Sequence, residues 1–273
     1  MINILVLGAS GLVGRAVINE MSKNPEFQVY GTYFRNRAAL NQQRSFYLDI
    51  ENPMNINSIL DNIKPEIIVS CLRGDFKNQL SLHIKAAKYL KKNGGRLYLC
   101  STTNVFDNDM SRPHYEDDMM NSCSDYGKYK IECEKRITEI LQDNACILRL
   151  PQIWGKDSPR MNQLCNISKN NETATVYPNL FCNTNTDITI AKQLSYIIKH
   201  NMKGVFHLAA EDVINHKDFC SRLIKGLGYN IRTQESFEEE GYFALLSNRN
   251  NELPVQLRFT NESVINYLTK SIK

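Results

Sequence analysis

Short apolar runs alternate with amphipathic patterns along the first 150 residues. The runs are continuous, as in strands that a sheet buries on both faces, and the segments between them carry apolar residues at helical spacing. The predicted strands are residues 2–7, 27–32, 45–48, 66–71, 96–100 and 145–150, and the predicted helices are residues 12–21, 53–63, 76–92 and 124–142. This alternation indicates the α/β class with a doubly wound parallel sheet.

The pattern changes beyond Pro151. We expect a sheet domain over residues 1–150 and a smaller lobe over 151–273, in which helices and short strands interleave with the sheet edge. Residues 170–185 are polar and are expected to be irregular. The other predictions for the lobe are a loop at 155–159, helices at 160–169, 187–200 and 215–226, a strand at 204–208, and a last helix capped by Thr260-Asn261 and extending through 272.

Composition narrows the class of protein. The chain has 273 residues, of which 42% are hydrophobic, so it can bury a large core and is not expected to be disordered. Its 33 Lys+Arg and 29 Asp+Glu are scattered, which gives no reason to expect a nucleic-acid partner. No apolar stretch approaches the ~20 residues needed to cross a bilayer. No basic segment precedes the first apolar run, so we expect a cytoplasmic protein without a signal peptide or membrane contact.

The eight cysteines do not form a recognisable metal or redox motif. None belongs to a Cys-x-x-Cys pair, and none lies near a histidine at the spacing of metal ligands. Cys71, Cys100 and Cys146 end or fill apolar runs, where a thiol behaves as a small hydrophobic group. We therefore expect reduced thiols and no metal site.

A glycine-rich turn separates the first predicted strand from the first helix. Its glycines permit a tight turn, close approach of the backbone to a pyrophosphate and close packing of helix on strand. The start of the helix adds free N–H groups and a partial positive charge. The sequence thus predicts a dinucleotide site, with a purely structural turn as the alternative. The expected contacts are Gly8, Ser10, Gly11, Leu12, Val13 and Gly14.

The end of the second predicted strand indicates the type of dinucleotide. An acidic residue there would bind the ribose 2′-OH of NAD, but residues 31–37 read GTYFRNR. Arg35 and Arg37 can instead bind a 2′-phosphate, so NADP(H) is preferred and NAD(H) remains an option. The alternative is a solvated basic loop. Asp49 and Ile50 are expected at the adenine edge, although Asp49 is equally consistent with a turn residue.

A candidate acid–base set follows the fifth predicted strand. Tyr126 and Lys130 are four residues apart, which places them on one face of a helix. A nearby ammonium favours the phenolate and lowers the pKa of a tyrosine from ~10 toward the working range. The hydroxyl of Thr102, at the carboxyl end of the strand, is expected at the edge where doubly wound sheets bind ligands.

In combination, these motifs resemble the extended short-chain dehydrogenase/reductase superfamily, and more closely the dTDP-4-dehydrorhamnose reductase-like sugar-nucleotide reductases. The resemblance spans most of the chain and is most specific over residues 1–155. It implies a Rossmann domain over 1–150, a substrate-binding lobe, and catalysis by Thr102, Tyr126 and Lys130, with Ser101 a weaker choice than Thr102. The motifs that carry it are 8–14 (GASGLVG), 101–107 (STTNVFD), 126–130 (YGKYK), 147–155 (ILRLPQIWG), 183–187 (NTNTD) and 204–208 (GVFHL).

Cofactor contacts are further expected from Cys71, Leu72 and Pro151, together with Tyr126 and Lys130. The family usually has Ala-Ala after its fourth strand. This chain instead has Ser70-Cys71, followed by an arginine at position 73.

The expected substrate contacts include two departures from the family pattern. Arg73 could bind a substrate phosphate or pair with Asp75. Gln152 stands where the family tends to place a Trp, and Trp154 occupies a neighbouring aromatic position. The full set of expected substrate residues is Arg73, Thr103, Asn104, Gln152, Trp154 and Asn162. Arg160 begins the same predicted helix as Asn162, and both could be ordinary helix-start residues.

The leading functional hypothesis is NADPH-dependent reduction of the 4-keto group of a nucleotide-activated deoxysugar. A nucleotide-sugar epimerase on the same scaffold is one alternative, and a non-catalytic NADP-binding regulatory subunit is another. A dehydratase is disfavoured because Thr103-Asn104 supplies no acid beside the strand-end hydroxyl. A homodimer is compatible with each of these hypotheses.

Overall fold

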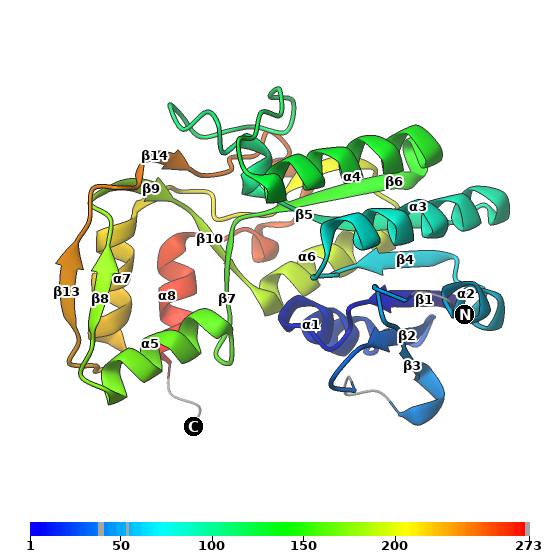
Figure 1. Ribbon diagram of the computed structural model, residues 1–273, viewed down its shortest axis with the longest axis horizontal. Coiled ribbons are helices and arrows are strands. Elements are labelled where there is room, and N and C mark those ends of the chain that lie inside the picture. Colours follow the sequence, from blue (N-terminus) through cyan, green and yellow to red (C-terminus); the bar gives the residue numbers. More distant parts are fainter. Residues whose placement is uncertain (38–40, 53–54, 271–273) are drawn as a thin grey trace.

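A seven-stranded sheet forms the centre of the computed structural model, which describes residues 1–37, 41–52 and 55–270 (Figure 1). The strand order is β11-β6-β5-β4-β1-β2-β3, and all neighbouring strands are parallel. This arrangement confirms the predicted α/β class. The strands are β1 (Ile2–Leu7), β2 (Phe27–Tyr33), β3 (Ser45–Tyr47), β4 (Ile67–Ser70), β5 (Arg96–Thr102), β6 (Ala145–Leu150) and β11 (Gly204–His207).

Helices cover both faces of the sheet. One face packs against α1 (Leu12–Met21) and α6 (Asp187–Lys199). The other face packs against α2 (Ile56–Ile63), α3 (Phe76–Asn93) and α4 (Asp125–Leu141). The strands of the sheet are almost completely buried because both faces are covered, which explains their continuous apolar sequences. None of the described helices is both long enough and apolar enough to cross a membrane.

The chain beyond residue 151 forms a lobe beside the carboxyl edge of the sheet, and within this stretch it returns to the sheet through α6 and β11 (Figure 1). The lobe has its own apolar cluster, built mainly from its three helices. Its helices are α5 (Pro159–Lys169), α7 (His216–Gly226) and α8 (Asn261–Thr269). Its strands are β7 (Gln152–Trp154), β8 (Thr173–Val176), β9 (Asn179–Cys182), β10 (Thr184–Thr186), β12 (Ile214–Asn215), β13 (Arg232–Glu235) and β14 (Glu240–Phe243).

Most predicted elements lie where the sequence pattern places them, and two differ. The segment 170–185 is not irregular but holds β8, β9 and β10. In β8 and β9 exposed and buried residues alternate, so only every second side chain enters the core. The last helix begins at Asn261, and the Thr260 hydroxyl lies 3.3 Å from the Ser263 hydroxyl without capping the helix backbone. The parts of the predicted helices at residues 53–54 and 271–272 lie outside the described residues.

Candidate active site

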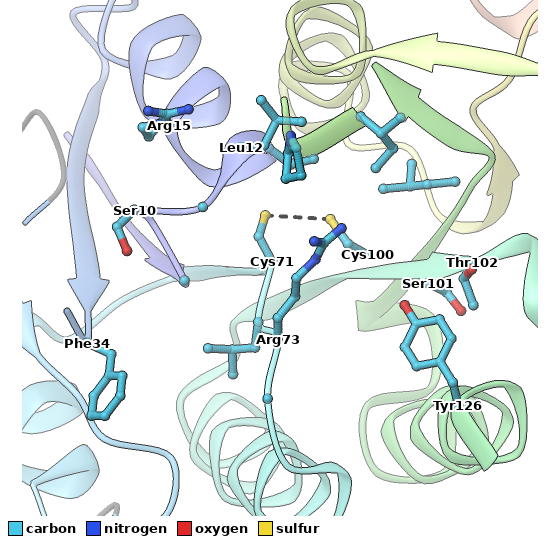
Figure 2. A pocket seen from close by; sticks show the side chains of 18 of the residues that line it. Ser10, Leu12, Arg15, Phe34, Cys71, Arg73, Cys100, Ser101, Thr102 and Tyr126 are labelled. Carbon is cyan, nitrogen blue, oxygen red and sulfur yellow. Dashed lines mark hydrogen bonds between the residues drawn. The ribbon is translucent and has the colours of Figure 1, made fainter. Parts of the chain in front are cut away.

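A cavity of about 1000 Å³ opens at the carboxyl ends of β1, β2, β4, β5 and β6 (Figure 2). Its walls come from the glycine turn, the segments that follow β2, β3 and β4, the start of α4, and the lobe. Ligands of open α/β sheets bind at this edge, beside the point where the strand order reverses. The predicted site residues found in the lining are Gly8, Ser10, Gly11, Leu12, Val13, Arg35, Asp49, Ile50, Cys71, Leu72, Arg73, Thr102, Thr103, Asn104, Tyr126, Lys130, Pro151 and Gln152.

The glycine turn has the geometry of a phosphate cradle. Gly8 has φ +77°, a left-handed conformation that favours glycine. A Cβ at Gly14 would lie 2.3 Å from the carbonyl oxygen of Gly8, so helix and strand meet too closely for any side chain there. Gly11 precedes α1, and no side chain caps this helix and no acid lies in its first turn. The first N–H groups of α1 are therefore suited to a ligand's phosphates.

Arg35 lies exposed on the wall that follows β2. Its guanidinium lies 5.9 Å from the ring centre of Phe34, and it has no carboxylate partner within the described residues. Arg37 differs, because its guanidinium donates to the Tyr33 hydroxyl at 3.4 Å and does not line the cavity. Asp49, after β3, also lines the cavity. One of its carboxylate oxygens accepts the N–H of Glu51 at 2.9 Å, as expected for a turn residue.

Thr102, Tyr126 and Lys130 meet at one end of the cavity. The Tyr126 phenol points from α4 toward the end of β5, where Thr102 lies (Figure 2). Lys130 is buried, with its Nζ 6.0 Å from the Tyr126 ring centre, and it donates to the Cys100 carbonyl at 2.8 Å. The Thr102 hydroxyl donates to Asn104 Oδ1 at 2.9 Å, at the start of the short helical turn Thr103–Phe106.

Ser101 and Thr102 both line the cavity, but the Ser101 hydroxyl is bonded to a buried ion pair. Ser101 donates a short hydrogen bond to Glu134, which is buried on α4. Arg149 of β6 donates to both oxygens of the same carboxylate, at 2.9–3.3 Å. The Arg149 guanidinium also donates to the Glu116 carbonyl at 3.0 Å. These bonds connect the ends of β5 and β6 to α4, which carries Tyr126.

Arg73 and Arg160 also contribute guanidinium groups to the cavity lining. Arg73 projects into the cavity from the loop after β4 (Figure 2). Asp75 does not pair with it, but instead caps α3 by accepting the Asn78 N–H at 2.8 Å. Arg160, at the start of α5, also lines the cavity, and desolvation together with the positive charge of Arg73 lowers its pKa. Neither guanidinium forms an ion pair with a described carboxylate, so the pair presents net positive charge to the cavity.

Three expected contact residues do not line the cavity. Trp154 is buried in the apolar cluster of the lobe, with its ring centre 5.2 Å from that of Phe219. Asn162 is on the exposed face of α5. Gly14 serves the packing of α1 on β1. Trp154 and Asn162 lie outside the lining, and their contact with a substrate stays a prediction.

Sequence reasoning also missed several lining residues. Arg15 and Asp157 form an ion pair of 2.5 Å that joins α1 to the lobe at the cavity rim. Cys100, Gln163 and Phe243 belong to the lining as well. Arg15 directly follows the glycine turn in the sequence, and this proximity was the only sequence feature that could have indicated its place in the cavity lining. Among the described residues, no group of three or more His, Cys, Asp or Glu side chains is arranged to hold a metal ion.

Comparisons with known proteins agree with this geometry. A dTDP-4-keto-6-deoxy-D-glucose reductase of Streptomyces niveus is 24% identical over 218 residues, which are 74% of this chain and 71% of that protein. Methionine adenosyltransferase 2 subunit beta of Danio rerio is 31% identical over 165 residues, 56% of this chain and 48% of that protein. A dTDP-4-dehydrorhamnose reductase of Bacillus anthracis, solved in complex with NADP, covers 98% of both chains with a TM-score of 0.79 at 17% identity, which shows a shared fold.

The family model of the RmlD substrate binding domain matches residues 78–247. This match includes α4 with Tyr126 and Lys130, the end of β5 and most of the lobe, and it covers more than half of the chain. The chain therefore belongs to the RmlD substrate-binding domain family.

Proposed function

We propose that this chain is an NADPH-dependent reductase of the 4-keto group of a nucleotide-activated deoxysugar. The observation that carries the proposal is the convergence of three elements on one cavity. These are a glycine turn suited to phosphates, an acid–base set at the end of β5, and a pair of unpaired guanidinium groups. The reductase named among the relatives, at 24% identity, supports the same reaction class.

The cofactor half of the cavity fits a dinucleotide phosphate. The uncapped start of α1 would receive the pyrophosphate at Ser10, Gly11 and Leu12. Arg35, which has no described carboxylate partner, would bind a 2′-phosphate by charge-assisted hydrogen bonds. Bound NADPH would supply a hydride to the substrate carbonyl carbon.

The chain's own residues would then manage the charge that develops on the carbonyl oxygen. Tyr126 would give that oxygen its phenolic proton, and Thr102 would donate a hydrogen bond to it. The Thr102 hydroxyl currently donates to Asn104 Oδ1, so contact with substrate would replace that bond. The buried ammonium of Lys130 would stabilise the phenolate that remains and contact the nicotinamide ribose.

Arg73 and Arg160 would bind the diphosphate of the sugar nucleotide. Burial and the positive charge of Arg73 lower the pKa of Arg160, and an anion bound between the two guanidinium groups would offset this repulsion. A planar guanidinium can also donate two parallel hydrogen bonds to two oxygens of one phosphate. Gln152, which also lines the cavity, would contact the sugar.

A non-catalytic subunit is the second candidate function. The likeness to methionine adenosyltransferase 2 subunit beta, 31% over 165 residues, favours it. A subunit of this kind would keep the cofactor cavity without needing an aligned proton donor and a substrate anion site. Tyr126, Thr102 and the arginine pair are all present, which favours the reductase.

Purified protein mixed with NADPH and a panel of 4-keto-6-deoxy nucleotide sugars tests the proposal, with NADPH consumption as the readout. We expect turnover with at least one member. Arg73→Met and Arg160→Met should each raise KM about tenfold, the effect of losing one charge-assisted hydrogen bond, and should leave NADPH affinity unchanged. Tight NADPH binding without turnover of any keto sugar would support the subunit instead.

A further inference from the structure

Two cysteines lie side by side in the cavity that holds the glycine turn. Cys71 follows β4 and Cys100 lies in β5. The strands are parallel with Ser70 opposite Leu99, so the two cysteines are the next pair in register. Their sulfur atoms are 3.6 Å apart, and both residues line the cavity (Figure 2). The proposed reaction makes no use of either thiol.

The surroundings of this pair differ from those of the buried cysteines elsewhere. Burial raises the pKa of Cys146, Cys182 and Cys220 to about 12, as expected for inert core thiols. The pKa of Cys100 is lowered instead, because its hydrogen bond with the Cys71 thiol and the nearby Lys130 ammonium together outweigh its burial, while the same contact raises the pKa of Cys71. A thiolate at Cys100 would thus be stabilised and would have a second thiol in contact with it.

The backbone geometry is compatible with a covalent link. Neighbouring strands lie about 4.8 Å apart, and disulfide-bonded cysteines have Cα atoms roughly 4.4–6.8 Å apart. The two sulfurs must approach by about 1.6 Å to reach the ~2.05 Å of an S–S bond. Rotation of both side chains over this distance needs little backbone movement.

We propose that Cys71 and Cys100 form an oxidation-sensitive dithiol that hydrogen peroxide converts to a disulfide on the floor of the cofactor cavity. The Cys100 thiolate attacks one oxygen of the peroxide, the O–O bond breaks, and a sulfenic acid forms while the leaving hydroxide takes up the proton that Cys100 released, giving water. The Cys71 sulfur then attacks the Cys100 sulfur, the S–O bond breaks, and a second water leaves with the Cys71 proton. Two electrons pass from the thiols to one peroxide molecule, which becomes two molecules of water.

The position of Cys71 connects this modification to the glycine turn. The Cys71 carbonyl packs against Gly8 so closely that a Cβ on Gly8 would lie 2.8 Å from its oxygen. Because this contact is so tight, even a small shift of the Cys71 backbone during disulfide formation would move the phosphate-binding turn. A dinucleotide in the cavity should slow disulfide formation, and the disulfide should weaken dinucleotide binding by the same coupling.

Peptide mapping by mass spectrometry tests the first part of the proposal without any cofactor, so its result is independent of the proposed reductase activity. The reduced protein is treated with hydrogen peroxide, alkylated and digested. We expect a linked Cys71–Cys100 peptide that dithiothreitol removes, and the same product in the matched control Cys123→Ser, which lacks an exposed thiol. In Cys71→Ser, a sulfenic acid trapped by dimedone is expected at Cys100.

The same assay with saturating NADP⁺ tests the coupling. We expect disulfide formation to slow at least tenfold. If Cys71 and Cys100 are both still alkylated at peroxide concentrations that oxidise the exposed Cys123, the dithiol is not oxidation-sensitive and the proposal fails. If the disulfide forms at the same rate while NADP⁺ is bound, the coupling to the cavity is wrong.

Discussion

Replacement of Arg35 by alanine should reduce the affinity for NADPH and leave the affinity for NADH unchanged. Arg35 lines the cavity wall after β2, where no acid is available for a ribose 2′-OH. A hydrogen bond to a charged group contributes roughly 1.5–3 kcal/mol, and exposure of the Arg35 side chain to solvent reduces this. We therefore expect a loss of about tenfold, or ~1.4 kcal/mol.

Arg37→Ala is the matched control for this prediction. Arg37 carries the same charge two residues away, but it contacts Tyr33 and lies outside the cavity lining. Its removal should leave both affinities within about twofold. Isothermal calorimetry of NADPH and NADH binding to the native protein and the two variants measures this directly. Equal affinity of the native protein for the two cofactors, or equal losses in both variants, would refute the role of Arg35.

Three further predictions concern the stability of the fold, cofactor binding at the glycine turn and the pH dependence of unfolding. Arg149→Met should lower the free energy of unfolding by about 3–5 kcal/mol in a denaturant titration, because it leaves the buried Glu134 carboxylate unpaired; a loss below ~1 kcal/mol would contradict this. Gly14→Ala should abolish cofactor binding, since its Cβ would lie 2.3 Å from a backbone oxygen, whereas Gly94→Ala has open space around it and should cost only the roughly 1–2 kcal/mol of its left-handed conformation, φ +75°. Burial lowers the pKa of His207 to about 4, so the unfolded state binds the extra proton first and stability should fall as pH drops from ~6.5 to ~4; thermal unfolding that is unchanged across this range would exclude that contribution.

The sheet could be predicted well from the sequence because strands that are buried on both faces appear as continuous apolar runs. The β1, β6 and α1 bounds agree with the predicted ranges residue for residue, since continuous apolar runs and helical spacing are strong signals. The short strands of the lobe carry a weaker signal. In each of β8 and β9 only two of four side chains are buried, and three of the four exposed positions are polar, Phe181 being the exception, so the segment resembles a loop.

The parts of the candidate site that local sequence motifs define could be predicted, whereas those that depend on packing between distant segments could not. The glycine turn and the Tyr126–Lys130 spacing place their residues in the cavity as expected. The environment of Trp154 depends on Phe219, more than 60 residues later in the chain, so no local pattern could reveal it. The contact between Cys71 and Cys100 likewise depends on the register of two strands that a long helix separates.

The rate of turnover of Tyr126→Phe tests the central claim most directly. The variant removes one phenolic oxygen from a side chain that is 37% exposed, so the fold and NADPH affinity should persist. The control Tyr89→Phe removes a phenol from α3 outside the cavity lining. With the keto sugar that the native protein reduces fastest, kcat should fall about 10²–10⁴-fold for Tyr126→Phe and stay at the native value for Tyr89→Phe. Native turnover by Tyr126→Phe would contradict the assignment of the proton donor and, with it, the proposed chemistry of the cavity.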